Sequence, residues 1–301
     1  MPVRPLPLLN FFVVLVMLSI GLRVSGGELL KVLRNGALFT RTMVANCVLI
    51  PAIGFLLVKL FPLTPDASIG ILLLAAIPGT PIALQFTRQA KTHLAFAAVM
   101  TFLLSLVSIV LTPLAFEVMP RIAQRSERPI LNLIASMLLY ISVPLCVGLL
   151  VARRAPVTAR RLILPLNVLA SGVFIFLMWE TRLARREALH SIAGRGTILA
   201  MLSLLIISMI IGWFTGGPDN DSRRVLATST GMRSVIVVLY IARYCFPGTH
   251  IYMIPIVYIS LMVPANLLFH LAFTGWHKPR GMRNRALPQL LSIEHPRIEN
   301  E

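Results

Sequence analysis

Charged side chains are scarce in this chain. They make up 13% of its 301 residues, whereas 57% of the residues are hydrophobic and the mean hydropathy is +0.83. This composition excludes a soluble globular domain and is typical of an integral membrane protein. Only short links join the hydrophobic segments, so the sequence leaves no room for a separate soluble domain.

Carboxylates are scarcer still, and none lies well inside a hydrophobic segment. The chain has 11 Asp and Glu residues, each in a link, in the C-terminal tail or at the end of a segment. Proton relays and many intramembrane ion sites depend on a carboxylate near the bilayer midplane, and we expect none here. Paired aspartates and the His-Glu-x-x-His and Gly-x-Ser-x-Gly patterns are also missing. We therefore predict that the protein is not an enzyme and needs no cofactor.

Cysteine is equally rare. Cys47, Cys146 and Cys245 are far apart in the sequence, and each lies within a hydrophobic segment. Three scattered thiols form neither a metal-ligand pattern nor a disulfide framework. We expect no metal site and interpret the cysteines as small packing residues.

What the chain does have is long apolar runs. A membrane-spanning helix needs about 20 mainly apolar residues, and nine segments meet that requirement. The first follows a single basic residue and lacks a clear cleavage site, so we interpret it as a retained helix and not as a signal peptide. The fold class is therefore predicted to be an all-α integral membrane protein. The nine segments lie at about residues 7–23, 37–61, 67–87, 93–118, 130–152, 161–180, 196–215, 224–244 and 250–274.

The net charge of +17 is interpreted as membrane topology and not as a nucleic-acid surface. Lys and Arg are more frequent in one set of alternating links and in the tail, which the positive-inside rule assigns to the cytoplasm. With nine spans, the N-terminus then lies outside. We predict a transmembrane domain over residues 1–275, a basic cytoplasmic tail over 276–301, and a plasma or inner membrane location. The bilayer is the expected macroscopic partner, no nucleic acid is expected, and the oligomeric state stays open.

Two of the hydrophobic segments are interrupted by residues that break helices. Backbone that is not helical inside a bilayer must be sheltered by protein or line a watery cavity. Two such breaks at corresponding places in the two halves of a chain indicate the binding site of a transporter. The first break is formed by Pro78, Gly79, Thr80 and Pro81, and the second by Ser229, Thr230, Gly231, Met232, Arg233 and Ser234.

Together with other stretches, the breaks resemble the bile acid:sodium symporter family, also called the sodium/bile acid cotransporter family, over residues 8–274. The resemblance depends on the order and spacing of several short stretches, because no single motif is decisive. It implies inverted helical repeats in which two broken helices cross near mid-membrane. Helices 2, 3, 4, 7, 8 and 9 would form a core domain, and helices 1, 5 and 6 a panel domain. The supporting stretches are Gly21-Leu22, the amphipathic run 28–33, Asn46-Cys47-Val48-Leu49-Ile50-Pro51, Ala76-Ile77-Pro78-Gly79, Leu111-Thr112-Pro113 and Thr230-Gly231-Met232.

The chain departs from the family where the family binds sodium. The resemblance places sodium ligands at positions that here carry residues poorly suited to that ion. At the second sodium site, a glutamine of the family corresponds to Asn46 in this chain. Sodium needs several oxygen ligands, which this set does not supply. We therefore predict no sodium coupling of the family type. The substituted positions are Ala83, Leu84, Ala97, Thr101, Ser229 and Arg233.

Arg233 carries the functional hypothesis. A charge at the bilayer centre costs at least about 2.5 kcal/mol, so an arginine there faces a cavity or a partner. One interpretation is that its planar guanidinium binds the carboxylate, sulfonate or phosphate of a substrate. The other is that it ties backbone carbonyls together at the crossover; both remain open. The residues expected to orient the anion with Arg233 are Asn46, Thr80, Thr101, Ser229, Thr230, Ser234 and, by resemblance, Asn266, while Pro78, Gly79, Pro81, Gly231 and Met232 shape the crossover.

The predicted function is secondary transport of a small organic anion by alternating access. One alternative is a transport-inactive relative that acts as a membrane sensor or scaffold. A further alternative is a sodium-coupled bile-acid-type symporter with a rebuilt ion site.

Overall fold

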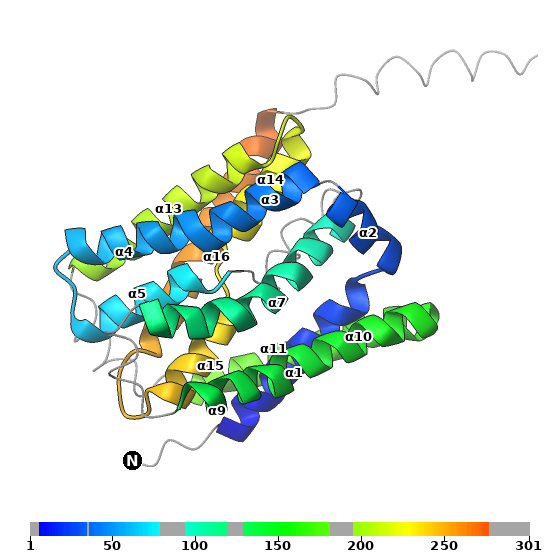
Figure 1. Cartoon of the computed structure of the whole chain (residues 1–301), viewed down its shortest axis with the longest axis horizontal. Helices are drawn as coiled ribbons and strands as arrows, with labels where there is room; N and C mark the ends of the chain where they lie inside the picture. Colours follow the sequence, from blue (N-terminus) through cyan, green and yellow to red (C-terminus); the bar gives the residue numbers. More distant parts are fainter. Residues whose placement is uncertain (1–5, 35, 79–93, 119–128, 181–194, 277–301) are drawn as a thin grey trace, which may run out of the picture. The chain divides into compact units, whose positions relative to one another are not determined.

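The computed structural model describes residues 6–34, 36–78, 94–118, 129–180 and 195–276. Within these ranges every regular element is helical, as predicted (Figure 1). In the part of the chain that the structure describes, seven helical stretches are long and apolar enough to cross a membrane, and two apolar helices, Pro7–Arg23 and Pro65–Ala76, are shorter. Each of the nine predicted segments contains described helix. The number of membrane crossings and the inverted repeats stay predictions.

The structure divides along the chain into two units. The first extends to Val263, and the second begins at Pro264. The division lies within helix α16, Met253–Trp276. Asn266 belongs to the second unit, and the helices and contacts described below belong to the first.

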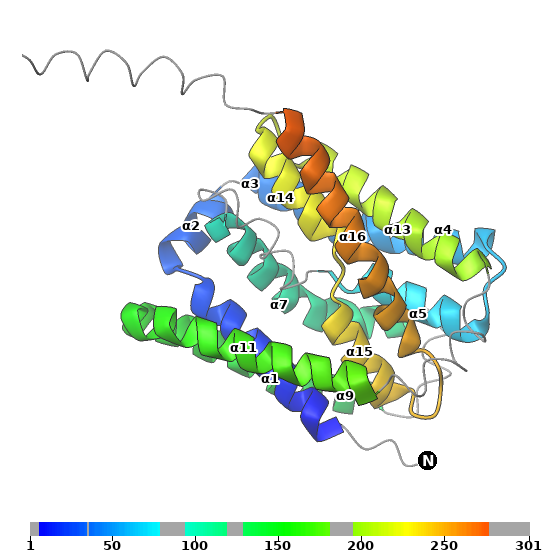
Figure 2. The ribbon, with the colours of Figure 1, turned by 180° about the vertical axis from the view of Figure 1, so that it is seen from behind.

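One group of helices packs around α1, Leu6–Arg23. This helix contacts α10, Val143–Arg154, and α11, Pro156–Glu180 (Figures 1 and 2). Gly21 and Gly148 let α1 and α10 approach backbone to backbone. A Cβ atom added to Gly148 would lie 2.5 Å from the Leu18 carbonyl oxygen, so no larger residue fits without moving a helix. Small residues allow such close packing where lipid provides no hydrophobic drive for association.

A second group is built from four helices. α13, Arg195–Thr215, packs on α14, Asn220–Gly231, and α4, Ile50–Leu60, packs on α5, Pro65–Ala76. Gly212 sets the close approach of α13 to α14, because an added Cβ atom would lie 2.4 Å from the Leu226 carbonyl oxygen. The longer α7, Leu94–Val118, contacts α1, α5 and α14, as well as the amphipathic helix α2, Gly26–Arg34.

Among the described helices, two contain a widened π turn, which the sequence did not lead us to predict. η1, Ala45–Leu49, joins α3, Gly36–Val44, to α4, and η3, Leu138–Ser142, joins α9, Ile130–Met137, to α10. A proline follows each π turn within two residues of its end, Pro51 after η1 and Pro144 after η3. A proline ring clashes with the carbonyl four residues earlier, and a wider turn relieves that clash.

The second predicted break is confirmed. α14 ends at Gly231, Met232 is extended with φ −84° and ψ 95°, and α15, Val235–Cys245, begins after Ser234. In this segment, residues 222–245, the most apolar window is 100% buried. The corresponding windows of the other six spans are between 11% and 56% buried. The broken helix is therefore the central element of the first unit.

The beginning of the first break is also confirmed. α5 ends at Ala76, and its cap, Ile77, is extended with φ −103° and ψ 100°. Pro78 is buried. The other residues predicted for this break and the neighbouring family sodium positions lie outside the described residues; they are Gly79, Thr80, Pro81, Ala83 and Leu84.

Candidate functional site

The two breaks lie side by side in the first unit. The backbone N–H of Ser234 donates to the carbonyl of Ile77 at 3.4 Å, which joins the start of α15 to the end of α5. The N–H of Val235 donates to the carbonyl of Arg233 at 2.7 Å, a tight turn that redirects the chain into α15. Segments 157 residues apart in the sequence therefore form one junction, which we call the crossover: residues 76–78 and 231–234.

Arg233 lies at the centre of the crossover, and its side chain is completely buried. Its Nε donates to the carbonyl of Leu74 at 2.8 Å, and one terminal nitrogen, Nη2, donates to the carbonyl of Ala75. These carbonyls belong to the last turn of α5, where a helix has no N–H groups of its own to satisfy them. The guanidinium therefore caps the C-terminal end of α5, where the helix dipole is negative.

Asn46 completes the surroundings of the guanidinium. Its Oδ1 accepts a hydrogen bond from Nη1 of Arg233 at 2.9 Å. Its Nδ2 donates to the carbonyl of Thr42 at 3.1 Å and to Oγ1 of Thr230 at 3.4 Å. Asn46 lies in the π turn η1, so this turn holds the amide between α14 and the guanidinium. Three helical segments are thereby linked through one buried polar network.

The other side of the second break is held by Tyr258 of α16, within the first unit. Its hydroxyl donates to the carbonyl of Gly231 at 2.8 Å, and the tyrosine is fully buried. Gly231 is the last residue of α14, so this bond satisfies a carbonyl that the broken helix leaves open. Gly231 also packs against Met209 of α13, whose Cγ would lie 2.3 Å from an added Cβ.

The charge at the crossover is balanced without a carboxylate in the described contacts of Arg233. Its three hydrogen-bond acceptors are uncharged oxygens: two carbonyls and one amide. A guanidinium does not lose its proton in proteins, so the positive charge is permanent. Among the described residues, no group of three His, Cys, Asp or Glu side chains is arranged to hold a metal ion.

The predicted site residues differ in what their side chains contact. The hydroxyl of Thr230 accepts from Asn46, which in turn accepts from Arg233, whereas Ser234 takes part in the crossover through its backbone N–H. The hydroxyl of Ser229 donates to the carbonyl of Leu226 at 3.3 Å, within its own helix. Thr101 in α7 likewise donates to the carbonyl of Ala97 at 2.8 Å. Their roles as substrate ligands, and that of Asn266 in the second unit, stay predictions.

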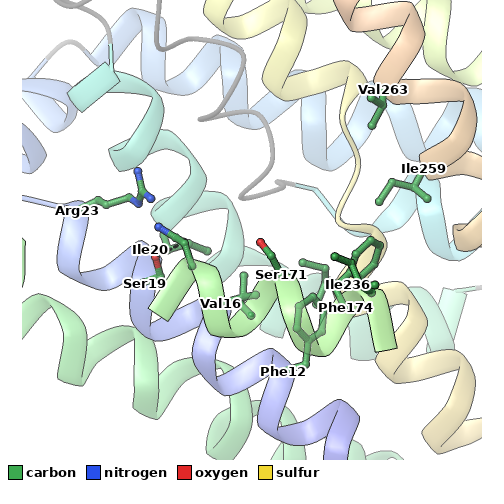
Figure 3. A pocket seen from close by; sticks show the side chains of 13 residues that line it. Phe12, Val16, Ser19, Ile20, Arg23, Ser171, Phe174, Ile236, Ile259 and Val263 are labelled. Atoms are coloured by element: carbon green, nitrogen blue, oxygen red, sulfur yellow. Dashed lines mark hydrogen bonds between the residues drawn. The ribbon is translucent and has the colours of Figure 1, made fainter. Parts of the chain in front are cut away.

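A separate cavity of about 290 Å³ lies beside α1 (Figure 3). Aromatic rings line part of it: Phe12 and Phe174 stack with ring centroids 5.7 Å apart. Ser19 donates to Oδ1 of Asn167 at 2.9 Å in its wall. Arg233 does not line it. The lining residues are Phe12, Val16, Ser19, Ile20 and Arg23 of α1, Asn167, Ala170, Ser171, Phe174 and Ile175 of α11, Ile236 of α15, and Ile259 and Val263 of α16.

The cavity has an apolar end and a cationic end. Along α1, Phe12 and Arg23 are separated by about 16 Å at 1.5 Å per residue, and Figure 3 shows Arg23 at one edge of the lining and Phe12 beside Phe174, away from Arg23. Arg23 is partly exposed. A cavity with mostly apolar walls and a few polar groups is typical of a small-molecule site.

The cavity was not predicted from the sequence, and neither were Leu74 and Ala75 as acceptors for Arg233, whereas Asn46 was expected beside Arg233. Polar residues inside predicted spans, such as Ser19 and Asn167, were a usable signal for the cavity. Tyr258, well inside a predicted span, was a similar signal for the crossover. The carbonyls of Leu74 and Ala75 gave no signal, because every residue carries a carbonyl.

Two comparisons relate this chain to known proteins. Residues 10–211 match the model of the sodium bile acid symporter family. The chain is similar to the probable sodium/metabolite cotransporter BASS5, chloroplastic, of Oryza sativa subsp. indica, with 22% identity over 82% of this chain and 64% of that protein. It is also similar to the P3 protein of Homo sapiens, with 23% identity over 57% of this chain and 36% of that protein. The chain thus spans between about a third and just under two thirds of the length of these relatives.

Proposed function

Because the chain belongs to the sodium bile acid symporter family, a family of multi-pass membrane transporters, we propose that it is a secondary transporter of a small organic anion. The observation that carries the proposal is the cavity beside α1, which combines apolar walls with the guanidinium of Arg23. A transporter family is also in keeping with a role that is not enzymatic.

The cavity indicates the chemical class of the substrate. Its volume of about 290 Å³ lies just below the usual range for small-molecule sites, roughly 300–1,000 Å³. The planar guanidinium of Arg23 is suited to a carboxylate or a sulfonate, whose two oxygens it can bind together. Ser171 and the Ser19–Asn167 pair offer further polar contacts. We infer a substrate with one anionic group and a compact apolar body.

The placement of the cavity supports alternating access. Its walls come from α1, α11 and α15 and from Ile259 and Val263 of α16. In the predicted division, α1 and α11 belong to the panel, and α15 and α16 to the core. Rocking of the panel against the core would then open the cavity first to one side of the membrane and then to the other. The broken helix at 232–234 provides a bend next to the moving surfaces.

Coupling is proposed to differ from that of a sodium cotransporter. The relative from Oryza sativa is named a probable sodium/metabolite cotransporter. In this chain the positions at which the family resemblance places sodium ligands carry Ala97, Arg233 and residues of similarly poor ligand chemistry. We therefore propose anion transport that does not require sodium. The predicted cell-membrane location, external N-terminus and cytoplasmic tail over 276–301 remain part of this proposal.

Ligand-dependent thermal stability of the purified protein tests the proposal. Potassium salts of acetate, benzoate, benzenesulfonate and taurocholate provide carboxylates and sulfonates with apolar bodies that range from small to large. We expect a small anion to raise the unfolding midpoint of the wild type. In the Arg23→Gln variant the affinity should fall about 10- to 150-fold, because a hydrogen bond to a charged group contributes roughly 1.5–3 kcal/mol.

Arg154→Gln is the matched control, because Arg154 is exposed at the end of α10. It should keep the anion response of the wild type. Equal loss of the response in both variants, or stabilisation by uncharged analogues such as benzamide to the same extent as by benzoate, would contradict the anion site. Uptake of the stabilising anion into proteoliposomes then separates transport from a sensor or scaffold role, in which the anion would bind without flux.

A further inference from the structure

The acceptors around Arg233 are those of a cation site. They are two main-chain carbonyl oxygens, of Leu74 and Ala75, and the amide oxygen of Asn46. In transporters with broken helices, the C-terminal ends of half-helices and unwound carbonyls are the groups that coordinate a soluble monovalent cation. At this crossover the cation in contact with them is a side chain of the protein.

The position of the charge adds to this interpretation. The carbonyls of Leu74 and Ala75 lie in the last turn of α5, where the helix dipole places partial negative charge. Arg233 comes from the break between α14 and α15, so the attraction joins the end of one helix to the gap in another. A soluble ion in the same place would join them in the same way, but it would leave when its concentration fell.

We propose that the guanidinium of Arg233 is a tethered cation, which occupies permanently the place of a soluble monovalent cation at the crossover. The side chain is completely buried, and its charge does not depend on pH in the physiological range. The crossover is thereby held together in any ionic medium. One consequence is that transport by the wild type needs no soluble cation. Only this consequence rests on the proposed transport function.

Removal of the side chain should uncover a latent cation site. An Arg233→Gly variant keeps the three oxygens and gains a polar space in which water or an ion finds several partners. Without a cation, the end of α5 loses its capping charge, and the junction with α15 weakens. With a cation of suitable size, the contact is restored. Free guanidinium ion carries the same donors as the missing group and is the first probe, and Na⁺ and K⁺ are the others.

The experiment compares unfolding midpoints of purified protein in lipid nanodiscs. The medium contains choline chloride, and guanidinium, sodium or potassium chloride then replaces it at constant low-millimolar ionic strength. The wild type should show the same midpoint in all four salts. The Arg233→Gly variant should unfold at a lower temperature in choline and should recover in a saturable way with guanidinium or an alkali cation. Arg233→Lys, which keeps a tethered charge, should resemble the wild type.

An equal midpoint of Arg233→Gly in all four salts would overturn the inference, and so would a saturable sodium response of the wild type. If Arg233→Gly yields no folded protein, Arg233→Gln serves in its place, and a midpoint that is independent of the cation in that variant also overturns it. Arg154→Gly controls for general effects of losing a positive charge at an exposed position. Anion binding in the cavity is measured separately through Arg23, so failure of this inference is distinguishable from failure of the proposed transport.

Discussion

Replacement of Asn46 with leucine tests the arrangement of the crossover without touching the arginine itself. Leucine has the same branching of side-chain heavy atoms as asparagine and favours a helix, but it removes the amide oxygen that accepts from Arg233 at 2.9 Å. It also removes the donor to Oγ1 of Thr230. One N–H of a fully buried guanidinium is then left without its acceptor.

The magnitude follows from the kind of bond that is lost. Neutral hydrogen bonds between membrane helices contribute about 0.6 kcal/mol on average, whereas a bond to a charged group contributes about 1.5–3 kcal/mol. We expect the charged bond to decide the outcome, because a buried charge without a partner is costly. For a chain of this size, each kcal/mol lost from the free energy of unfolding lowers the unfolding temperature by about 2–4 °C. The unfolding midpoint should therefore fall by about 3–12 °C.

The assay is thermal unfolding in detergent micelles, followed by tryptophan fluorescence. Asn132→Leu is the matched control, because Asn132 lies on α9 with an exposed side chain. The control should change the midpoint by no more than about 2 °C, as is usual for surface substitutions. If Asn46→Leu is no less stable than Asn132→Leu, the guanidinium does not depend on this amide, and the described network is wrong.

Two further substitutions test the packing and the second break. Gly148→Ala should destabilise the protein by about 1–3 kcal/mol, because the added methyl group meets the backbone of α1. Gly172→Ala adds a methyl group to open space and should be neutral. Equal unfolding midpoints for the two variants would refute the close approach of α1 and α10. Tyr258→Phe should cost about 0.5–1.5 kcal/mol by leaving the carbonyl of Gly231 without its donor, measured as a lower midpoint with unchanged anion affinity; an unchanged midpoint would argue against that hydrogen bond.

The helix breaks could be predicted from the sequence because local chemistry determines them. Pro78 and Gly231 each stand where a helix loses its regular hydrogen bonding, and α5 and α14 end at or just before these residues. The buried position of Arg233 also followed, since a charge in the middle of an apolar segment must find shelter. These features depend on residue type and on neighbours close in the sequence.

Asn46 and carbonyls in general were expected near Arg233, but which carbonyls bind it could not be predicted in the same way. Its acceptors on α5 are backbone oxygens 158 and 159 residues away, and Asn46 is 187 residues away. Which carbonyls face the guanidinium depends on where α5 ends and how it packs, and composition carries no such information. The sequence therefore left two roles for Arg233 open. The contacts support the role that ties carbonyls together, while binding of a substrate anion by Arg233 stays a prediction.

The cavity was missed for a related reason. Its residues come from four helices, and most are ordinary apolar side chains that also suit a membrane-facing surface. Only the combination of Arg23 with Ser19 and Asn167 on neighbouring helices distinguishes it. Such a combination becomes visible once the packing of α1 on α11 is known.

Uptake by wild-type protein in sodium-free proteoliposomes is the most direct test of the account. The anion that stabilises the purified protein best is supplied with choline, potassium or sodium as the cation, at equal membrane potential. We predict the same initial rate in all three media, because the positive charge at the crossover belongs to the protein. Uptake that requires sodium would contradict that claim.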